Sequence, residues 1–106
     1  MAAISTAAFV AAGVIAPTAA LAHGQTVFLD RAGCGYSGYS NHGYAETRRY
    51  SGSCSGHAWL RINWQGNLSS WTHGLPEVHV SVPNGTGIAY SQHKSCESCG
   101  AVTILH

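Results

Sequence analysis

The sequence predicts an all-β fold: a small antiparallel β-sandwich or barrel, stabilised by two disulfides and preceded by a cleaved signal peptide. Three observations predict it. Beyond residue 22, no stretch repeats apolar residues with the period of a helix, and several short runs alternate apolar and polar residues between turn signals. The chain also has 4 Cys in only 106 residues, together with 13 Gly. A chain of this length forms one domain.

The charge content excludes several classes of protein. Lys and Arg number 5 and Asp and Glu number 4, which is 8% of the residues and leaves a formal net charge of +1. Soluble domains carry about 25% charged residues. A disordered polyelectrolyte, a coiled coil and a basic nucleic-acid binder all need far more charge. We therefore expect no nucleic-acid partner.

Residues 1–22 have the pattern of a secretory signal peptide. They contain no charged side chain, and Ala20-Leu21-Ala22 is the small-x-small pattern that signal peptidase recognises. A cut after Ala22 is the first choice and one after Ala20 the second; a buried helix or a membrane anchor is the alternative. Cleavage would leave residues 23–106 as a single disulfide-stabilised β domain. It would be secreted and extracellular, without stable membrane insertion.

The four cysteines predict two disulfides, because an even number of cysteines in a small exported chain usually pairs. We favour Cys34–Cys54, whose long loop contributes roughly 3 kcal/mol in the chain-entropy model, with Cys96–Cys99 clamping a turn. The crossed pairing remains open. The CxxC at 96–99 is followed by a strand-like run, not by the helix that a redox site needs, and no second CxxC is present for a zinc ribbon.

The first half of the mature chain contains two expected strands and a long loop. Residues 25–30 read as a strand, and residues 31–43 read as a loop because glycine recurs there among tyrosine and serine. Residues 44–50 follow as a strand. Residues 51–56 are small and flexible.

The clearest strand is 57–64. Its predicted inward side chains are Ala58, Leu60, Ile62 and Trp64. Its predicted outward side chains are His57, Trp59, Arg61 and Asn63. A turn at 65–67 then predicts a hairpin whose returning strand is 68–72.

Three more strands complete the predicted fold. Residues 77–82 alternate, with the valines at 78, 80 and 82 inward, and Pro83-Asn84-Gly85-Thr86 is a strong turn signal. Residues 88–93 form the next strand, with Ile88 and Tyr90 inward. The clamped turn 94–100 then leads to a last strand, 101–105.

Aromatic and basic residues on predicted outward positions indicate a binding surface. Aromatic rings beside Arg and His are typical of recognition surfaces, because they offer large contact area at low entropic cost. An extracellular protein or glycan is the expected partner. The alternative is that a tryptophan packs inside a second layer. The predicted binding residues are Trp59, Arg61, Trp71, His73 and His79, with Tyr36 and Tyr39 on a flexible flanking loop.

The chain has 7 His, scattered without an HxH or HExxH motif. His73 and His79 are close enough in sequence to share a metal, although nothing specifies one. If every histidine became protonated near pH 5, seven positive charges would be added. We therefore expect partner binding or solubility to depend on pH.

His23 would become the first residue of the mature chain. An N-terminal histidine offers its amine and its imidazole to one copper ion, and this arrangement resembles the histidine brace of lytic polysaccharide monooxygenases. The resemblance covers one residue and a predicted cleavage site. It implies copper at His23, with a second histidine that the sequence does not identify. No other cofactor is expected.

The sequence favours binding over turnover. No nucleophile elbow, phosphate-binding loop or dinucleotide motif is present. A small secreted ribonuclease-like hydrolase would need a Glu base, a His acid and an Arg, which Glu77, His79 and Arg61 supply by type. The preferred function is a secreted non-enzymatic binding module: an adaptor, inhibitor or toxin part within an extracellular assembly.

Overall fold

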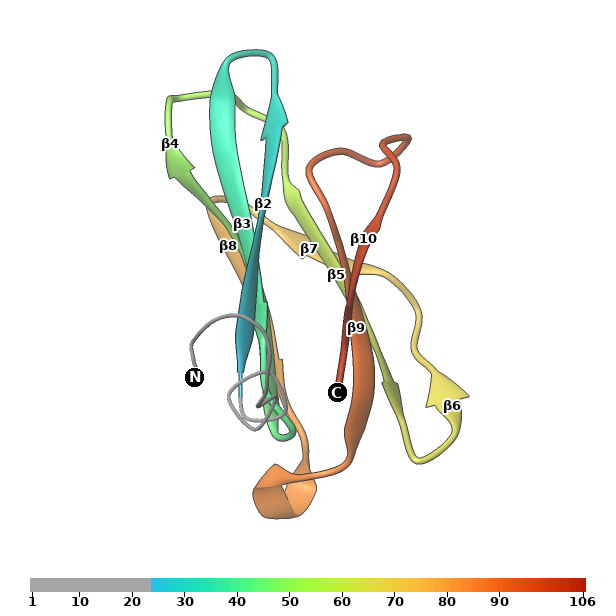
Figure 1. Ribbon diagram of the computed structural model, residues 1–106. Helices are drawn as coiled ribbons and strands as arrows, with labels where there is room; N and C mark the ends of the chain where they lie inside the picture. Colours follow the sequence, from blue (N-terminus) through green and yellow to red (C-terminus); the bar gives the residue numbers. More distant parts are fainter. Residues whose placement is uncertain (1–23) are drawn as a thin grey trace, which may run out of the picture.

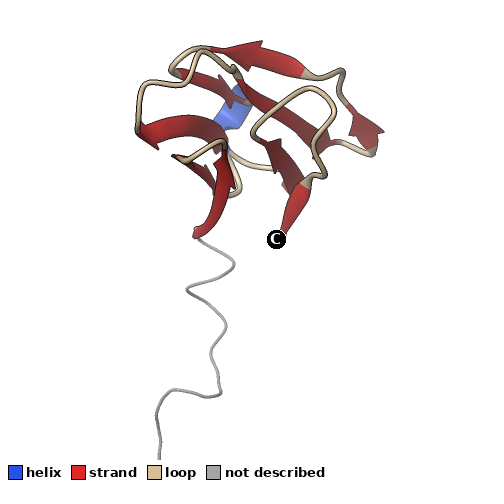
Figure 2. Cartoon of the chain, turned by 90° about the horizontal axis from the view of Figure 1, so that it is seen from above, coloured by secondary structure: helices blue, strands red, loops and turns tan. Residues whose placement is uncertain are grey.

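The computed structural model describes residues 24–106, and these form two antiparallel sheets that pack face to face (Figure 1). Viewed from above, the sheets form two layers that face each other across the core (Figure 2). The all-β prediction is therefore confirmed. The predicted signal peptide and the predicted copper ligand His23 lie outside the described residues.

The four-stranded sheet has the order β2-β3-β4-β8. Its strands are β2 (Gln25–Arg31), β3 (Cys34–Ser40), β4 (Tyr44–Ser51) and β8 (Glu77–Ser81). A tight turn at Ala32 and Gly33, both with positive φ, joins β2 to β3.

The 5-stranded sheet has the order β10-β9-β5-β6, and β7 also pairs with β5. Its strands are β5 (Ala58–Trp64), β6 (Asn67–Leu68), β7 (Thr72–Gly74), β9 (Ile88–Lys94) and β10 (Val102–Leu105). The 3-10 turn Pro83–Gly85 lies in the connection from β8 to β9, one of the places where the chain crosses between the sheets.

The prediction of a loop over residues 31–43 is wrong. Residues 34–40 form strand β3, which pairs with β2 on one side and with β4 on the other. Glycine is abundant there for a packing reason: a methyl group at Gly38 would overlap the imidazole of His93. Sequence rules read repeated glycine as flexibility, whereas here glycine makes room for a neighbour.

The inward pattern predicted for β5 is confirmed. Ala58, Leu60 and Ile62 are buried, and they pack against residues of the opposite sheet. One apolar cluster consists of Ala45, Leu60, Ile62, Val82 and Ile88. A second consists of Cys34, Tyr36 and Ala58.

The inward position predicted for Tyr90 is wrong. Ile88 is buried as expected, but the pairing of β5 with β9 shifts register between Asn63 and Trp64. This bulge inserts one residue, so the strand changes faces. Ser91 and His93 point inward in place of Tyr90.

A chain of polar side chains runs through the core beside the apolar clusters. The imidazole of His93 is 2.7 Å from the hydroxyls of both Thr47 and Ser91. Ser91 is in turn 2.7 Å from the Ser40 hydroxyl, which is 2.6 Å from Nε2 of His106. The buried side chains of Ser40, Thr47, Ser91 and His93 are therefore all hydrogen-bonded, which offsets the cost of burying them.

Both predicted disulfides are present. Cys34 is joined to Cys54 and Cys96 to Cys99, so the crossed pairing is excluded and none of the cysteines is free. The first bond ties the start of β3 to the segment that leads into β5. The second closes the turn between β9 and β10. Among residues 24–106 we find no helix long and apolar enough to cross a membrane.

Candidate functional site: a cation–aromatic surface on the five-stranded sheet

The outer face of β5 meets β7 at a stacked aromatic pair. Trp59 and His73 are direct partners in the register of β5 and β7, and their rings stack with centroids 4.1 Å apart at 26°. Trp59 is half-buried and His73 is exposed. The register therefore brings together two of the residues that the sequence predicted for the binding surface.

Lys94 continues this arrangement from the opposite side of β5. It pairs with Trp59 across β5 and β9, and its Nζ is 5.2 Å from the Trp59 ring centroid. The same Nζ is 4.1 Å from the Trp71 ring and donates a hydrogen bond of 2.7 Å to the Glu97 carbonyl. The ammonium thus interacts with both indoles, which are stabilised by cation–π attraction.

Arg61 completes the group. Its guanidinium carbon is 4.5 Å from the Trp71 ring centroid, and its Nε donates a 2.6 Å hydrogen bond to Gln92 on β9. Two cations, two indoles and the stacked imidazole of His73 therefore form one contiguous layer. We call it the cation–aromatic surface, and its members are Trp59, Arg61, Trp71, His73 and Lys94.

Two pockets flank this surface. The first, of about 410 Å³, is lined by both rings of the stacked pair, by His57 and by Arg31 and Glu97. The second, also about 410 Å³, is lined by Arg61, Trp71 and the strand residues around them. A partner that covers the surface would therefore have concave features on both sides to occupy.

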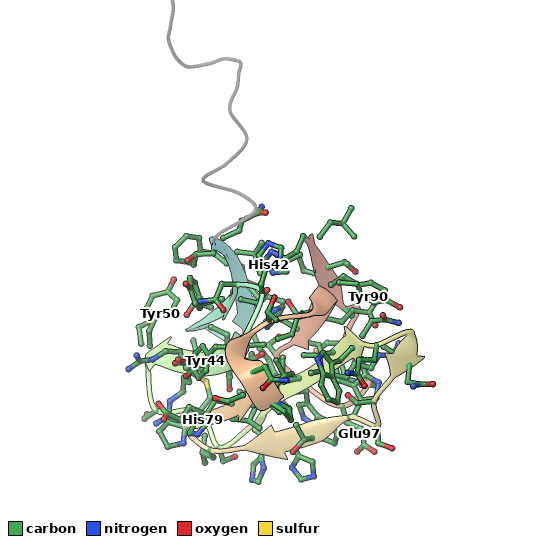
Figure 3. All side chains as sticks on the ribbon, turned by 90° about the horizontal axis from the view of Figure 1, so that it is seen from below. His42, Tyr44, Tyr50, His79, Tyr90 and Glu97 are labelled. Carbon is green, nitrogen blue, oxygen red and sulfur yellow. A yellow bond between two sulfur atoms is a disulfide. The ribbon has the colours of Figure 1, made fainter. Side chains whose placement is uncertain are left out.

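His79 occupies a different place from the other predicted binding residues. It lies in the wall of the second pocket, but its ring stacks with Tyr44 at 5.9 Å on the four-stranded sheet. Figure 3 shows these two side chains near each other, with Glu97 on another side of the molecule. Burial and a 2.7 Å hydrogen bond to Glu46 raise the pKa of Tyr44 to about 12, so this hydroxyl remains a neutral donor.

The two predicted tyrosines do not belong to a mobile binding loop. Tyr36 is fully buried and donates a 2.7 Å hydrogen bond from its hydroxyl to the Gly56 carbonyl. Tyr36 is therefore a core residue, and its side chain is not available for the partner contact predicted from the sequence. Tyr39 is half-buried on β3, accepts a hydrogen bond from Asn41 and lies against Tyr44.

Lys94, His57 and Arg31 were not among the binding residues predicted from the sequence. Lys94 was assigned to the turn after the strand, although it follows the outward residue Gln92 by two positions along β9. The predicted alternation, with Ile88 and Tyr90 inward, would have put Lys94 inward as well. Only the register shift between β5 and β9 places it beside Trp59. His57 precedes Trp59 by two positions, so the alternation of residues 57–64 already places the two on one face. Arg31 comes close to the surface only through the packing of a distant segment.

The residue types needed for a ribonuclease-like site are not all brought together. Arg61 and His79 both line the second pocket, whereas Glu77 is not among its lining residues. Within residues 24–106, no group of three or more His, Cys, Asp or Glu side chains could hold a metal ion. Two histidine pairs do occur: His57 with His73, and His42 with His106, whose ring centroids are 5.4 Å apart.

The buried histidine differs chemically from the surface histidines. Burial of His93, reinforced by the nearby His106, lowers its pKa from 6.5 to about 4. His93 therefore remains neutral at pH 5 and adds nothing to the positive charge that protonated histidines would bring.

Comparisons with known proteins do not assign a function. No family model matches the chain, no curated protein matches it, and no solved structure matches its fold. Function must therefore be inferred from the chemistry of the site itself.

Proposed function

We propose that the chain is a secreted, non-enzymatic binding module whose cation–aromatic surface contacts an extracellular protein. The observation that carries this proposal is the ammonium of Lys94, placed within cation–π distance of both Trp59 and Trp71. Large aromatic residues and arginine dominate the energetics of protein interfaces when they are held in place before the partner arrives. Here each of them is held by a neighbouring side chain.

A protein partner fits this surface better than a glycan. A pyranose stacks on an open indole face, but His73 and Lys94 approach Trp59 from the strands on its two sides, and Trp71 lies against Arg61 and Lys94. What remains for a partner is indole edges, guanidinium donors and an imidazole. Carboxylates and backbone carbonyls complement these groups, so a partner with an acidic patch is expected.

The test is capture of extracellular proteins from the producing culture with the immobilised chain, followed by mass spectrometry. Trp71→Ala and Arg61→Ala should each abolish capture of the partner. Arg48→Ala and Tyr50→Ala are matched controls, since both side chains are exposed on the other sheet, and they should retain it. Equal capture by all four variants would overturn the proposal. Binding to a glycan array that depends on Trp71 would identify a glycan as partner.

Copper binding at the mature N-terminus is a second candidate function. His42 and His106 lie together at the end of the sandwich where β2 starts, since Gln25 pairs with Ser40 and Ser40 bonds to His106. His23 precedes Gln25 by two residues in the sequence. This placement supports His42 or His106 as the second histidine that the copper hypothesis needs.

Metal analysis of the secreted chain, with its N-terminal residue determined, tests the copper candidate. One equivalent of copper in a chain beginning at His23, lost in His42→Gln or His106→Gln, would support it. Retention of the copper in both variants would contradict it.

A further inference from the structure

His57 and His73 direct the same ring nitrogen at each other. Their Nδ1 atoms are 2.9 Å apart, their ring centroids are 5.0 Å apart, and both side chains are exposed. Such a hydrogen bond requires one Nδ1 to carry the proton and the other to present its lone pair. With both Nδ1 atoms unprotonated, the two lone pairs would face each other across the gap between the rings.

Convergent imidazole lone pairs are the arrangement that binds divalent transition metals. A zinc ion holds each histidine nitrogen at roughly 2.0–2.1 Å, which for tetrahedral angles separates the two nitrogens by about 3.4 Å. The observed spacing is about half an ångström shorter. Because both rings are on the surface, a small rotation of the His57 side chain would supply the difference.

The two histidines are also held in place. His73 is stacked on Trp59 and lies on β7, which pairs with β5. His57 immediately precedes Ala58, the buried first residue of β5. One ligand therefore lies on β7 and the other directly before the adjacent strand β5, so most of the ordering needed to bind a metal is already present.

We propose that His57 and His73 form a binding site for one divalent transition-metal ion, with Cu²⁺ bound more tightly than Zn²⁺. The order of affinity follows from the general preference of nitrogen ligands for copper among these ions. The site is distinct from the N-terminal copper candidate, and it does not depend on the proposed protein partner.

The surroundings determine what kind of site this is. Glu97 lines the same pocket and supplies a carboxylate, whereas Arg31, also in the wall, opposes cation binding. The described residues provide only two firm ligands, so the remaining positions on the metal are open to water or to a donor from a bound molecule. Such an ion would act as a bridge and not as a closed structural centre.

The experiment titrates the purified full chain with CuCl₂ and with ZnCl₂, measuring heat and tryptophan fluorescence. Cu²⁺ bound at His73 lies against the Trp59 indole and should quench it. His57→Gln and His73→Gln should each weaken this binding event by at least about tenfold, since even loss of an outer-shell partner typically costs that much. His79→Gln is the matched control, because His79 is another exposed histidine stacked on an aromatic ring.

The proposal is supported if one saturable equivalent is weakened or lost in both His57→Gln and His73→Gln and persists with His79→Gln. Copper held at a mature N-terminal His23 would survive both substitutions and is thereby distinguished. The proposal would be overturned if the wild-type protein bound no such equivalent of metal. It would also be overturned if His57→Gln bound the metal as tightly as the wild-type protein does. Either result leaves the protein-capture test of the binding module unaffected, since that test uses Trp71 and Arg61.

Discussion

The Trp59 indole is stacked on the His73 imidazole with 4.1 Å between ring centroids, and the two residues are direct partners across β5 and β7. They are 14 positions apart in the chain, and only the antiparallel register makes them neighbours. Lys94 lies opposite Trp59 on β9. The outer face of one strand is therefore covered from both sides before any partner binds.

Replacing Lys94 with methionine should destabilise this arrangement. The ammonium interacts with two indoles and with the Glu97 carbonyl, and a partly desolvated cation–π contact contributes roughly 1–2 kcal/mol. We expect a lower denaturation midpoint and a weaker near-ultraviolet circular dichroism signal from tryptophan. Lys94→Arg keeps the cation and should retain most of the signal. An unchanged spectrum in Lys94→Met would contradict the role of the ammonium.

The stability of the fold should fall as the pH is lowered from 6.5 to 4. Burial holds the pKa of His93 at about 4, whereas the unfolded chain takes up that proton near pH 6.5. Between these values the unfolded state binds more protons than the folded state, so the free energy of unfolding decreases with falling pH, in total by about 3 kcal/mol. Below pH 4 the folded state also binds the proton, and this contribution levels off.

Urea denaturation at a series of pH values measures this effect. The difference between the wild-type protein and His93→Gln isolates the contribution of His93 from those of the exposed histidines. The difference should change with pH only within the stated window. A constant difference between pH 7 and pH 4 would show that His93 is protonated as easily in the folded state as in the unfolded state.

Gly38→Ala should destabilise the protein by roughly 1–3 kcal/mol, the usual cost of overpacking a core. The added methyl group would overlap the His93 imidazole, which is itself fixed by hydrogen bonds to Thr47 and Ser91. Ser37→Ala, at the adjacent outward position of β3, is the control and should have little effect. Equal melting temperatures for the two variants would refute the packing role of Gly38.

The two disulfides should differ in their contribution to stability. The Cys34–Cys54 bond spans 20 positions, while Cys96–Cys99 spans 3. Chain entropy then assigns about 3 kcal/mol to the first and about 2 kcal/mol to the second. Paired Cys→Ser substitutions followed by chemical denaturation measure both values. A larger loss for the 96–99 pair would show that loop closure is not the controlling term.

The strands with strict alternation could be predicted from the sequence. Ala58, Leu60 and Ile62 of β5 are all buried as their spacing required, because alternate side chains of a strand must share a face. The same spacing put Trp59 and Arg61 outward. Lys94, which pairs with Trp59, was not predicted for this face, because the last residue of β9 was expected to belong to the following turn.

The failures have specific physical causes. Repeated glycine in residues 31–43 suggested a loop, but Gly38 permits close approach of His93 from the opposite sheet. The bulge between Asn63 and Trp64 reversed the faces of β9, so Tyr90 is not inward. Both causes involve segments about 25 to 55 positions apart, which local patterns do not encode.

The sequence alone was enough to predict the all-β class and the faces of the regular strands, because alternate side chains of a strand share a face. It favoured the observed disulfide pairing but left the crossed pairing open, and the structure excludes the latter. Which outward residues meet depends on the register of the sheet. The register of β5 against β7 and β9 places His73 and Lys94 beside Trp59, and chain reversal brings His57 to His73. Register depends on the packing of the whole sheet, and so the site does as well.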